Sequence, residues 1–372
     1  MGIQNLVSFL RKKFPSVFKP IHLSELAYKK VAIDVFYYIC ILKYRFGEKF
    51  LYHILRMISV LRKNDIHLVM VFDGKAPIDK NGEKKERREA KEKTKDKISE
   101  IETALEELSL NGTISEVLLE FQKKRKINDD TLFLKKNIVN VKGIEAEIKK
   151  MKQQMFQISP ANIADMKQLL KLCNVPYIEA VEEAETTCAS LCIDGKVDAV
   201  LSEDTDVLAY GTPVFLTKAD FSESACMRID YSELLTTLKM TSKQFRDFCI
   251  LCGTDYNKNI PGVGIVGAYN YILKFEKIEN ITPSVDASIL NYPRVRELFT
   301  PRHGSVSKIH YCGEPNFEEI REFLLLKNQG FDLSGIIQNF NKTLIFSEDN
   351  ENGDHSSSSV VVVSVSSSFC ET

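Results

Sequence analysis

The chain alternates between short apolar runs and stretches with helical periodicity. Five runs rich in β-branched and other apolar residues cover residues 30–36, 67–74, 174–179, 198–206 and 213–217. Between them, residues 50–61 and 163–172 space their apolar side chains as an amphipathic helix does. Continuous apolar strands separated by helices predict an α/β fold, with a mostly parallel central sheet and helices on both faces.

A charged segment interrupts this alternation. Residues 75–155 contain 20 Lys and Arg against 16 Asp and Glu. This composition predicts long solvated helices that project from the sheet, with a turn at Asn111-Gly112. Because residues 84–97 are nearly all charged, we expect residues 90–155 to be mobile without a partner. The Ser- and Val-repetitive end of the chain predicts a disordered tail over residues 347–372.

Composition excludes several classes of protein. With 372 residues and a formal charge of −1, the chain is not a uniformly basic nucleic-acid coat, so a nucleic-acid site must be a local basic patch. The chain has no run of about 18 apolar residues, so the sequence predicts no membrane helix. Nine cysteines, mostly in apolar contexts, indicate an intracellular, reduced protein. Cys249 and Cys252 are interpreted as core residues rather than metal ligands.

Acidic residues recur beside these apolar segments. Asp34 interrupts the first run, whereas Asp73 ends the second. Burying an unpaired carboxylate costs several kcal/mol, so the recurrence needs a common cause. Carboxylates gathered at a sheet edge are typical of Mg²⁺ or Mn²⁺ sites, and seven are more than one ion needs. Two ions close together catalyse phosphoryl displacement. The seven acids are Asp34, Asp73, Glu183, Glu185, Asp204, Asp206 and Asp255.

Spacing constrains the two acid pairs. Asp204 and Asp206 share one face if their strand continues through them. Glu183 and Glu185 cannot share a face of a regular helix, where positions i and i+2 differ by about 200°. One glutamate must therefore lie on the turn that enters the helix, or the two must serve different ions.

Several blocks, in order along the chain, resemble the flap endonuclease/XPG family of structure-specific 5′ nucleases. The resemblance runs from residue 1 to about 345. It implies a PIN-like nuclease core, a helical arch insertion and a helix-hairpin-helix-type DNA motif at about 253–275. The blocks are Met1-Gly-Ile-Gln-Asn-Leu6, Lys30-Val-Ala-Ile-Asp34, Val71-Phe-Asp-Gly-Lys75-Ala-Pro77, residues 180–189, Ser202-Glu-Asp204-Thr-Asp206, Cys249-Ile-Leu-Cys-Gly-Thr-Asp255-Tyr256, Ile260-Pro-Gly262-Val-Gly264 and Gly313-Glu-Pro-Asn316.

The resemblance also implies a domain organisation. The expected parts are an N-terminal nuclease region over 1–97, an extended charged arch over 98–160, an internal nuclease region over 161–346 and the tail over 347–372. The segment from Asp73 to Glu183 is longer than is usual for cellular members. Ile265-Val266 stands where the family has basic residues, and neither a standard sliding-clamp box nor a nuclear-targeting run is found. The divergence of the chain and its lack of these accessory motifs suggest a virus or a parasite as the source.

The resemblance assigns roles to single residues. All seven acids fall on ligand positions for two Mg²⁺ ions, for which Mn²⁺ substitutes. Lys80 and Arg87 fall at the foot of the arch as catalytic cations that neutralise charge at the scissile phosphate, the alternative being solvated helix charges. The residues expected to contact DNA are Gly2, Arg45, Gly262 and Gly264.

The predicted function is therefore a DNA endonuclease that cleaves 5′ flaps or branched DNA during replication, repair or recombination. We expect a monomer that acts in the nucleus, or in a host nucleus if the source is viral. Two alternatives stay open. One is a 5′ exonuclease or RNA-cleaving nuclease of the same fold. The other is a non-catalytic DNA-binding scaffold, which the retention of seven costly buried acids disfavours.

Overall fold

The computed structural model describes residues 2–75, 77–127, 139–155, 158–281, 285–301, 308–340, 345–346 and 362–363. The chain forms two compact units, one of residues 1–78 with 160–372 and one of residues 79–159. Each unit is described by itself. None of the helices in the described ranges is both long enough and apolar enough to cross a membrane.

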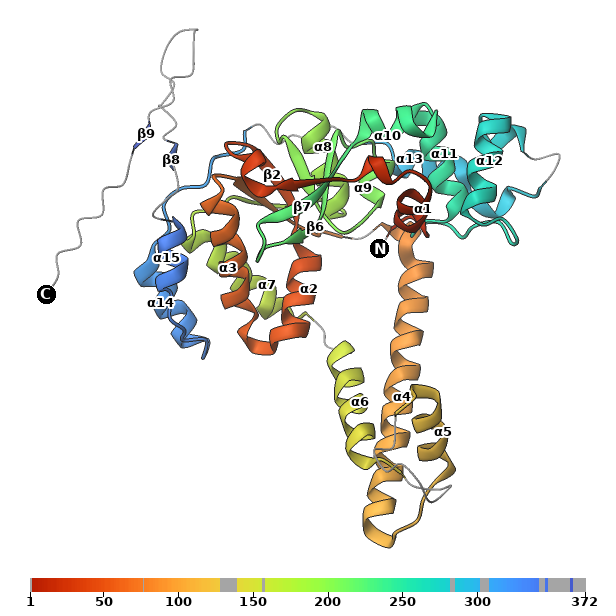
Figure 1. The fold of residues 1–372 in the computed structure, drawn as a ribbon, viewed down its shortest axis with the longest axis vertical. Coiled ribbons are helices and arrows are strands. Elements are labelled where there is room, and N and C mark those ends of the chain that lie inside the picture. Colours follow the sequence, from red (N-terminus) through yellow and green to blue (C-terminus); the bar gives the residue numbers. More distant parts are fainter. Residues whose placement is uncertain are drawn as a thin grey trace, which may run out of the picture. The chain divides into compact units, whose positions relative to one another are not determined.

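A seven-stranded mixed sheet organises the larger unit (Figure 1). The strand order is β1-β7-β6-β5-β2-β3-β4. The last five strands in this order, from β6 to β4, pair in parallel with their neighbours. Four of the five predicted runs contain one of these strands, and the run over 213–217 covers the first part of β6, so the predicted mostly parallel α/β sheet is confirmed. The strands are β1 (Lys19–His22), β2 (Lys30–Asp34), β3 (His67–Phe72), β4 (Tyr177–Glu179), β5 (Ala199–Leu201), β6 (Val214–Asp220) and β7 (Ala225–Asp230).

Two strands at one edge were not predicted. β7 pairs antiparallel with β6, and β1 pairs antiparallel with β7. β7 therefore has partners on both sides and β1 is the edge strand; Arg228 and Asp230 of β7 are half-buried and form an ion pair with each other at 2.6 Å. The parallel part of the sheet, which carries the candidate site, is therefore shielded from edge pairing on this side by two antiparallel strands.

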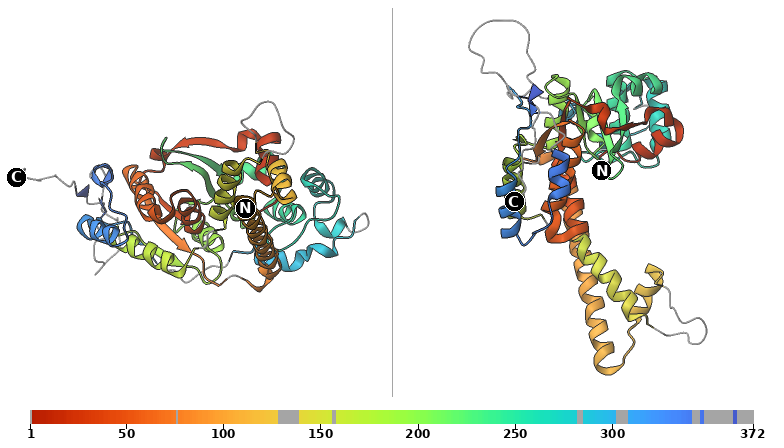
Figure 2. Two further views of the ribbon diagram at one scale, coloured as in Figure 1. Left: turned by 90° about the horizontal axis from the view of Figure 1, so that it is seen from below. Right: turned by 60° about the vertical axis from the view of Figure 1, so that its left-hand side comes forward.

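Helices surround the sheet (Figure 2). Ala32, Val69 and Val200 pack into the core beneath α1 and α8, whereas alternate residues of the same strands point to the opposite face, where α2 and α3 contact β3. The helices of this unit are α1 (Leu6–Lys13), α2 (Val35–Phe46), α3 (Phe50–Lys63), α7 (Pro160–Leu172), α8 (Ala184–Ile193), α9 (Asp206–Ala209), α10 (Tyr231–Leu238), α11 (Ser242–Cys252), α12 (Ile265–Phe275), α13 (Tyr292–Leu298), α14 (Phe317–Leu326) and α15 (Ser334–Phe340).

Short 3₁₀ turns complete this unit. They are η1 (Pro15–Val17), η2 (Leu23–Leu26), η3 (Gly47–Lys49), η5 (Ile278–Asn280) and η6 (Ser288–Leu290). A further turn, η4 (Ile78–Lys80), begins where the chain passes into the second unit.

The second unit is helical, as predicted, and consists of α4 (Asn81–Asn111), α5 (Glu116–Arg125) and α6 (Val141–Gln154). Gly112, with φ +73°, ends α4 at the predicted turn. Both contact patterns and views place the three helices side by side (Figures 1 and 2). The unit begins at residue 79 rather than at 98, because α4 continues unbroken through residues 97 and 98.

This helical unit has a hydrophobic core of its own. Ile101, Leu118 and Ile144, one from each helix, are fully buried. The charge of residues 84–97, on which the expected mobility of residues 90–155 rests, gives no sign of this core. The cause is that single apolar residues at helical spacing, scattered among charges, meet only when three helices come together. The core residues are Ile98, Ile101, Ala104, Leu118, Phe121, Ile144, Ile148 and Met151.

The tail contains one small departure from the expected lack of structure. Val362–Val363 forms β9, which pairs antiparallel with β8 (Ile345–Phe346). Two consecutive valines favour this extended pairing because β-branched side chains are suited to strands. The rest of the predicted tail, residues 347–361 and 364–372, lies outside the described residues.

Candidate active site

Asp34 and Asp73 stand at the same edge of the sheet. Asp34 is the last residue of β2, paired with Val71 of β3, and Asp73 directly follows β3. Asp34 thus does not interrupt its run but ends it: its carboxylate caps α2 by accepting from the Phe36 N–H at 3.3 Å. Parallel neighbours end together, so their terminal side chains meet at the carboxyl edge, where open α/β sheets bind ligands.

Asp204 and Asp206 lie in the turn after β5. The strand ends at Leu201, so the two aspartates do not share a strand face, contrary to that interpretation of their spacing. Asp206 is instead the first residue of α9, is fully buried, and donates its backbone N–H to Asp204 Oδ1 at 2.9 Å. The turn folds this way because an aspartate side chain caps the free N–H groups of the short helix that follows.

Ser202 joins this turn to Asp34. Its hydroxyl donates to Asp34 Oδ2 at 3.1 Å and accepts from the Asp204 N–H at 3.0 Å. Sequence reasoning missed this residue, although it directly precedes the acidic block. The sequence does contain a sign of its role: Ser202 is a small hydroxyl residue that directly follows a strand and directly precedes the acidic block.

Glu183 and Glu185 lie at the start of α8. Glu183 is the N-cap residue and Glu185 is within the first turn, which is one of the two arrangements that their spacing allowed. Both are nearly buried. Asp73 Oδ1 accepts the backbone N–H of Ala184 at 2.8 Å, which ties the end of β3 to this helix start. Carboxylates at a helix N-terminus are stabilised by the free N–H groups there.

Asp255 follows α11 in a loop and is half-buried. The neighbouring Tyr256 donates its hydroxyl to Glu183 Oε2 at 2.5 Å, which joins this loop to α8. Tyr256, like Ser202, was not predicted as a site residue. The two side chains link acid blocks that are far apart along the chain.

Gly2 lies against the acidic turn. Its φ is +79°, and a Cβ on it would lie 2.7 Å from Asp206 N and closer still to the Asp204 carboxylate. The next two residues hold the segment in place, because the Ile3 N–H donates to Thr205 at 2.9 Å and the Gln4 N–H donates to Gly253 at 3.1 Å. The N-terminal segment therefore runs beside the carboxylates, and only glycine fits at position 2.

The electrostatics of the edge favour a bound cation. Burial, followed by the charges of Asp73 and Asp204, raises the pKa of Asp34 to about 7. The described residues hold no group of three or more His, Cys, Asp or Glu side chains already arranged around one ion. Mg²⁺ requires no such group, because it keeps several waters and uses one or two carboxylates. The carboxylate oxygens are donors that hard divalent ions prefer, and Gly2 places no side chain in the space beside them.

Replacing Asp34 with asparagine should stabilise the protein in EDTA at pH 8. Its pKa is about 7 in the folded state against 3.8 ordinarily. The stabilising proton is therefore fully bound below pH 3.8, and its contribution is lost as the pH rises through 7. Asparagine carries no charge at any pH, so its gain should reach a few kcal/mol at pH 8. Thermal denaturation between pH 4 and 8 measures the difference from the wild-type protein. A difference that does not change with pH would contradict this result, and Asp198→Asn is the exposed control.

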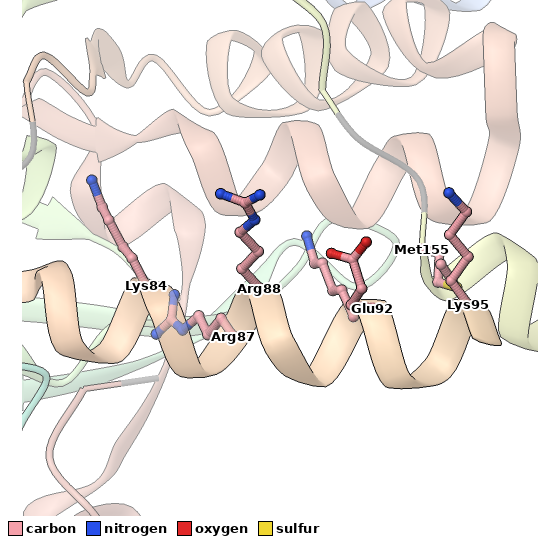
Figure 3. A pocket seen from close by; sticks show the side chains of 7 residues that line it. Lys84, Arg87, Arg88, Glu92, Lys95 and Met155 are labelled. Atoms are coloured by element: carbon pink, nitrogen blue, oxygen red, sulfur yellow. The ribbon is translucent and has the colours of Figure 1, made fainter. Parts of the chain in front are cut away.

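The second unit carries the two predicted catalytic cations. Lys80 ends η4 and is buried, and Arg87 lies on α4 seven residues later. A groove of about 450 Å³ runs along this part of α4 (Figure 3). Lys84, Arg88 and Lys95 project from one side of the helix, whereas Arg87 leaves it in another direction. The groove is lined by Lys84, Arg87, Arg88, Lys91, Glu92, Lys95 and Met155.

The other predicted DNA contacts are spread over the larger unit. Gly262 has φ +78° in the turn between α11 and α12, and Gly264 is the N-cap residue of α12; the space around both is open. α11 and α12 pack against each other, so the hairpin has the predicted helix-hairpin-helix arrangement. Arg45 is in the last turn of α2, about 16 Å along the helix from Asp34. A contact between Arg45 and DNA stays a prediction.

Acids from five separate segments of the chain lie at or beside the carboxyl edge of this sheet, an arrangement typical of enzymes that act on phosphate esters. Comparison with known proteins agrees. The XPG N-terminal domain matches residues 1–94, and the XPG I-region matches residues 174–255. All seven acids, together with Lys80 and Arg87, fall inside these two matches. The chain belongs to the XPG family of nucleases.

Curated relatives support this membership along most of the chain. The probable RAD2-like endonuclease 076L of Invertebrate iridescent virus 3 is 36% identical over 89% of this chain and 94% of its own length. The probable RAD2-like endonuclease 369L of Invertebrate iridescent virus 6 is 30% identical over 92% of each chain. Flap endonuclease 1 of Scheffersomyces stipitis is 29% identical over 94% of this chain and 85% of its own.

Solved structures share the fold. The catalytic core of Rad2, in complex with a DNA substrate, superposes with a TM-score of 0.62 at 17% identity, over 91% of this chain and 99% of that one. Flap endonuclease-1 from Methanococcus jannaschii gives 0.58 at 21% identity, over 89% and 96%. The PIN-like nuclease fold expected from the sequence is confirmed.

Proposed function

We propose that this chain is a structure-specific DNA endonuclease that cleaves 5′ flaps or related branched DNA by hydrolysing a phosphodiester bond. The observation that carries the proposal is the joining of five acid blocks by Ser202, Tyr256, the Ala184 N–H and the N-terminal glycine segment. The names of the relatives, RAD2-like endonuclease and flap endonuclease 1, support the same activity.

The carboxylates would hold two Mg²⁺ ions, with Mn²⁺ as a substitute. When bound, such ions supply activation of water and neutralisation of charge at the phosphate. The chain itself does the positioning. Ser202 and Ala184 orient Asp34 and Asp73 through hydrogen bonds, and Gly2 leaves the space beside Asp204 free of any side chain. Arg87 and Lys80 add positive charge for the phosphate oxygens.

Two surfaces would bind the DNA backbone. The groove on α4 offers five cations on or beside one helix face to the phosphates of a displaced single strand. The hairpin at Gly262 and Gly264 exposes backbone and the free N–H groups of α12 to a duplex phosphate. Because these contacts are to phosphates, affinity should fall steeply with salt and depend little on base sequence.

The decisive experiment compares four substrates under single-turnover conditions: a 5′ flap, a linear duplex with a recessed end, a blunt duplex and an all-RNA flap. The proposal expects Mg²⁺-dependent cleavage near the flap junction and little cleavage of the others. Preference for the linear duplex would establish a 5′ exonuclease, and preference for RNA would establish an RNA-cleaving enzyme. Binding without cleavage at any Mg²⁺ concentration would establish a scaffold.

The proposal also covers the oligomeric state of the protein, its compartment and its recruitment to DNA. The protein acts as a monomer, in the nucleus or a host nucleus, and is recruited without a standard sliding-clamp box. Sedimentation of the free protein and of its flap complex tests the monomer. A pull-down with a purified sliding clamp tests the absence of clamp binding.

The helical unit should be largely ordered before DNA arrives. Because residues 98–121 and 144–151 contribute side chains to one core, we expect the amide hydrogens of these two segments to be protected without DNA. Residues 84–95 are exposed and should gain protection only with a 5′ flap. Hydrogen exchange with no DNA, with blunt duplex and with flap DNA measures both. Rapid exchange over 98–121 and 144–151 without DNA would support the expectation of a mobile arch.

A further inference from the structure

A chain of hydroxyl groups reaches Glu183 from the side of α9 and the Asp255 loop. Tyr256 Oη donates to Glu183 Oε2 at 2.5 Å. Tyr210 Oη lies 3.2 Å from Tyr256 Oη, and Thr186 Oγ1 lies 2.8 Å from Tyr210 Oη. Glu183 and Thr186 both belong to the start of α8, so the chain leaves this helix and returns to it.

The direction of these hydrogen bonds follows from counting hydrogens. Each hydroxyl has one hydrogen to donate. Tyr256 gives its hydrogen to the Glu183 carboxylate, so Tyr210 must donate to Tyr256, and Thr186 in turn donates to Tyr210. All three bonds therefore point toward the carboxylate. Hydrogen bonds aligned in this way polarise one another and strengthen the last one.

The two tyrosine rings are held in place by one buried aromatic side chain. Phe299 is fully buried, and its ring centroid lies 5.4 Å from that of Tyr256 and 5.2 Å from that of Tyr210, both edge to face. The last donor in the chain is thus held in position against the Glu183 carboxylate.

We propose that Tyr256 is a positioning residue for the divalent metal site, because its hydroxyl fixes one oxygen of Glu183 and so holds the rest of that carboxylate in a single orientation. Tyr210 supports Tyr256 and links it to α9, the helix that begins at Asp206. The inference rests on the proposed function, because it assumes that Glu183 binds a divalent ion. Residues that orient a metal ligand typically contribute 10- to 100-fold to metal affinity.

Mn²⁺ binding without DNA tests this role, with free Mn²⁺ followed by electron paramagnetic resonance. Tyr256→Phe keeps the ring and its packing on Phe299 but removes the donor, and we expect the Kd for Mn²⁺ to rise about 10-fold or more. Tyr210→Phe should shift the Kd in the same direction by less. Tyr231→Phe is the matched control, since it removes a hydroxyl that meets Ser242 at 3.0 Å away from the acids.

Cleavage gives a second measurement. In Tyr256→Phe the Mg²⁺ concentration for half-maximal flap cleavage should rise by a similar factor, and the rate at saturating Mg²⁺ should recover most of its value. An unchanged Kd for Mn²⁺ together with a lower Tm would overturn the proposal, because the hydroxyl would then only stabilise the fold. If the wild-type protein binds Mn²⁺ but cleaves no branched DNA, the proposed function is wrong. The change in the Kd for Mn²⁺ in Tyr256→Phe still tests the positioning role of Tyr256 in that case. A wild-type protein that binds no Mn²⁺ would overturn the inference itself.

Discussion

Replacing Asp73 with alanine should lower the single-turnover rate of flap cleavage by about 10³-fold or more, while binding of the flap persists. Divalent ions at a phosphate contribute several kcal/mol to the transition state, and each 1.4 kcal/mol is tenfold in rate. Asp73 lies at the end of β3, and its carboxylate also accepts the Ala184 N–H at the start of α8. The phosphate contacts proposed for DNA, on α4 and at the hairpin before α12, involve other residues, so the Kd for DNA should change little.

Two further variants distinguish the loss of the Asp73 carboxylate from a disturbance of the fold. Asp73→Asn keeps an acceptor for the Ala184 N–H but loses the charge, so it should be nearly as inactive as the alanine variant. Asp198→Ala removes an exposed aspartate from the amino end of β5, where it accepts the Lys30 backbone N–H and pairs with Lys29, and should cleave like wild type. Activity of Asp73→Asn close to wild type at saturating Mg²⁺ would reject Asp73 as a metal-binding residue.

Arg87→Ala should slow the chemical step by about 10²-fold and weaken DNA binding much less. A charge that acts mainly on the transition state changes kcat rather than affinity, and the loss of one such donor typically costs 10²- to 10³-fold. Arg87 lines the groove on α4 but leaves the helix in a different direction from Lys84 and Arg88 (Figure 3). Single-turnover rates at saturating enzyme isolate this step from binding.

Arg88→Ala provides the matched control for Arg87→Ala. Arg88 is the next residue on the same helix and lines the same groove, so the two variants lose the same charge from nearly the same place. We expect Arg88→Ala to raise the Kd for flap DNA, to lower the salt dependence of binding by about one phosphate contact and to leave the single-turnover rate unchanged. Equal effects of both variants on rate would make Arg87 one of several binding cations.

Much of the candidate site could be predicted from the sequence because of one geometric rule. Parallel strands end at a common edge, so acids that follow apolar runs, such as Asp73 and Asp204, should gather there, whereas Asp34 is seen to end its strand only in the structure. The spacing of Glu183 and Glu185 allowed either a place for one of them on a helix-entry turn or separate ions for the two, and the structure has Glu183 as the N-cap residue. The exact course of the turn after β5 could not be predicted, since it depends on a side-chain cap and not on periodicity.

The parallel strands, the acids beside them and the charged helical insertion can be predicted from the sequence, because each depends on neighbours within a few turns or strands. Which side chains connect the acid blocks follows from the tertiary structure alone. Ser202 meets Asp34 across 168 residues, and Tyr256 meets Glu183 across 73. Contacts between distant positions leave no periodic trace, and so neither these hydroxyl links nor the separate core of the helical unit follows from local pattern.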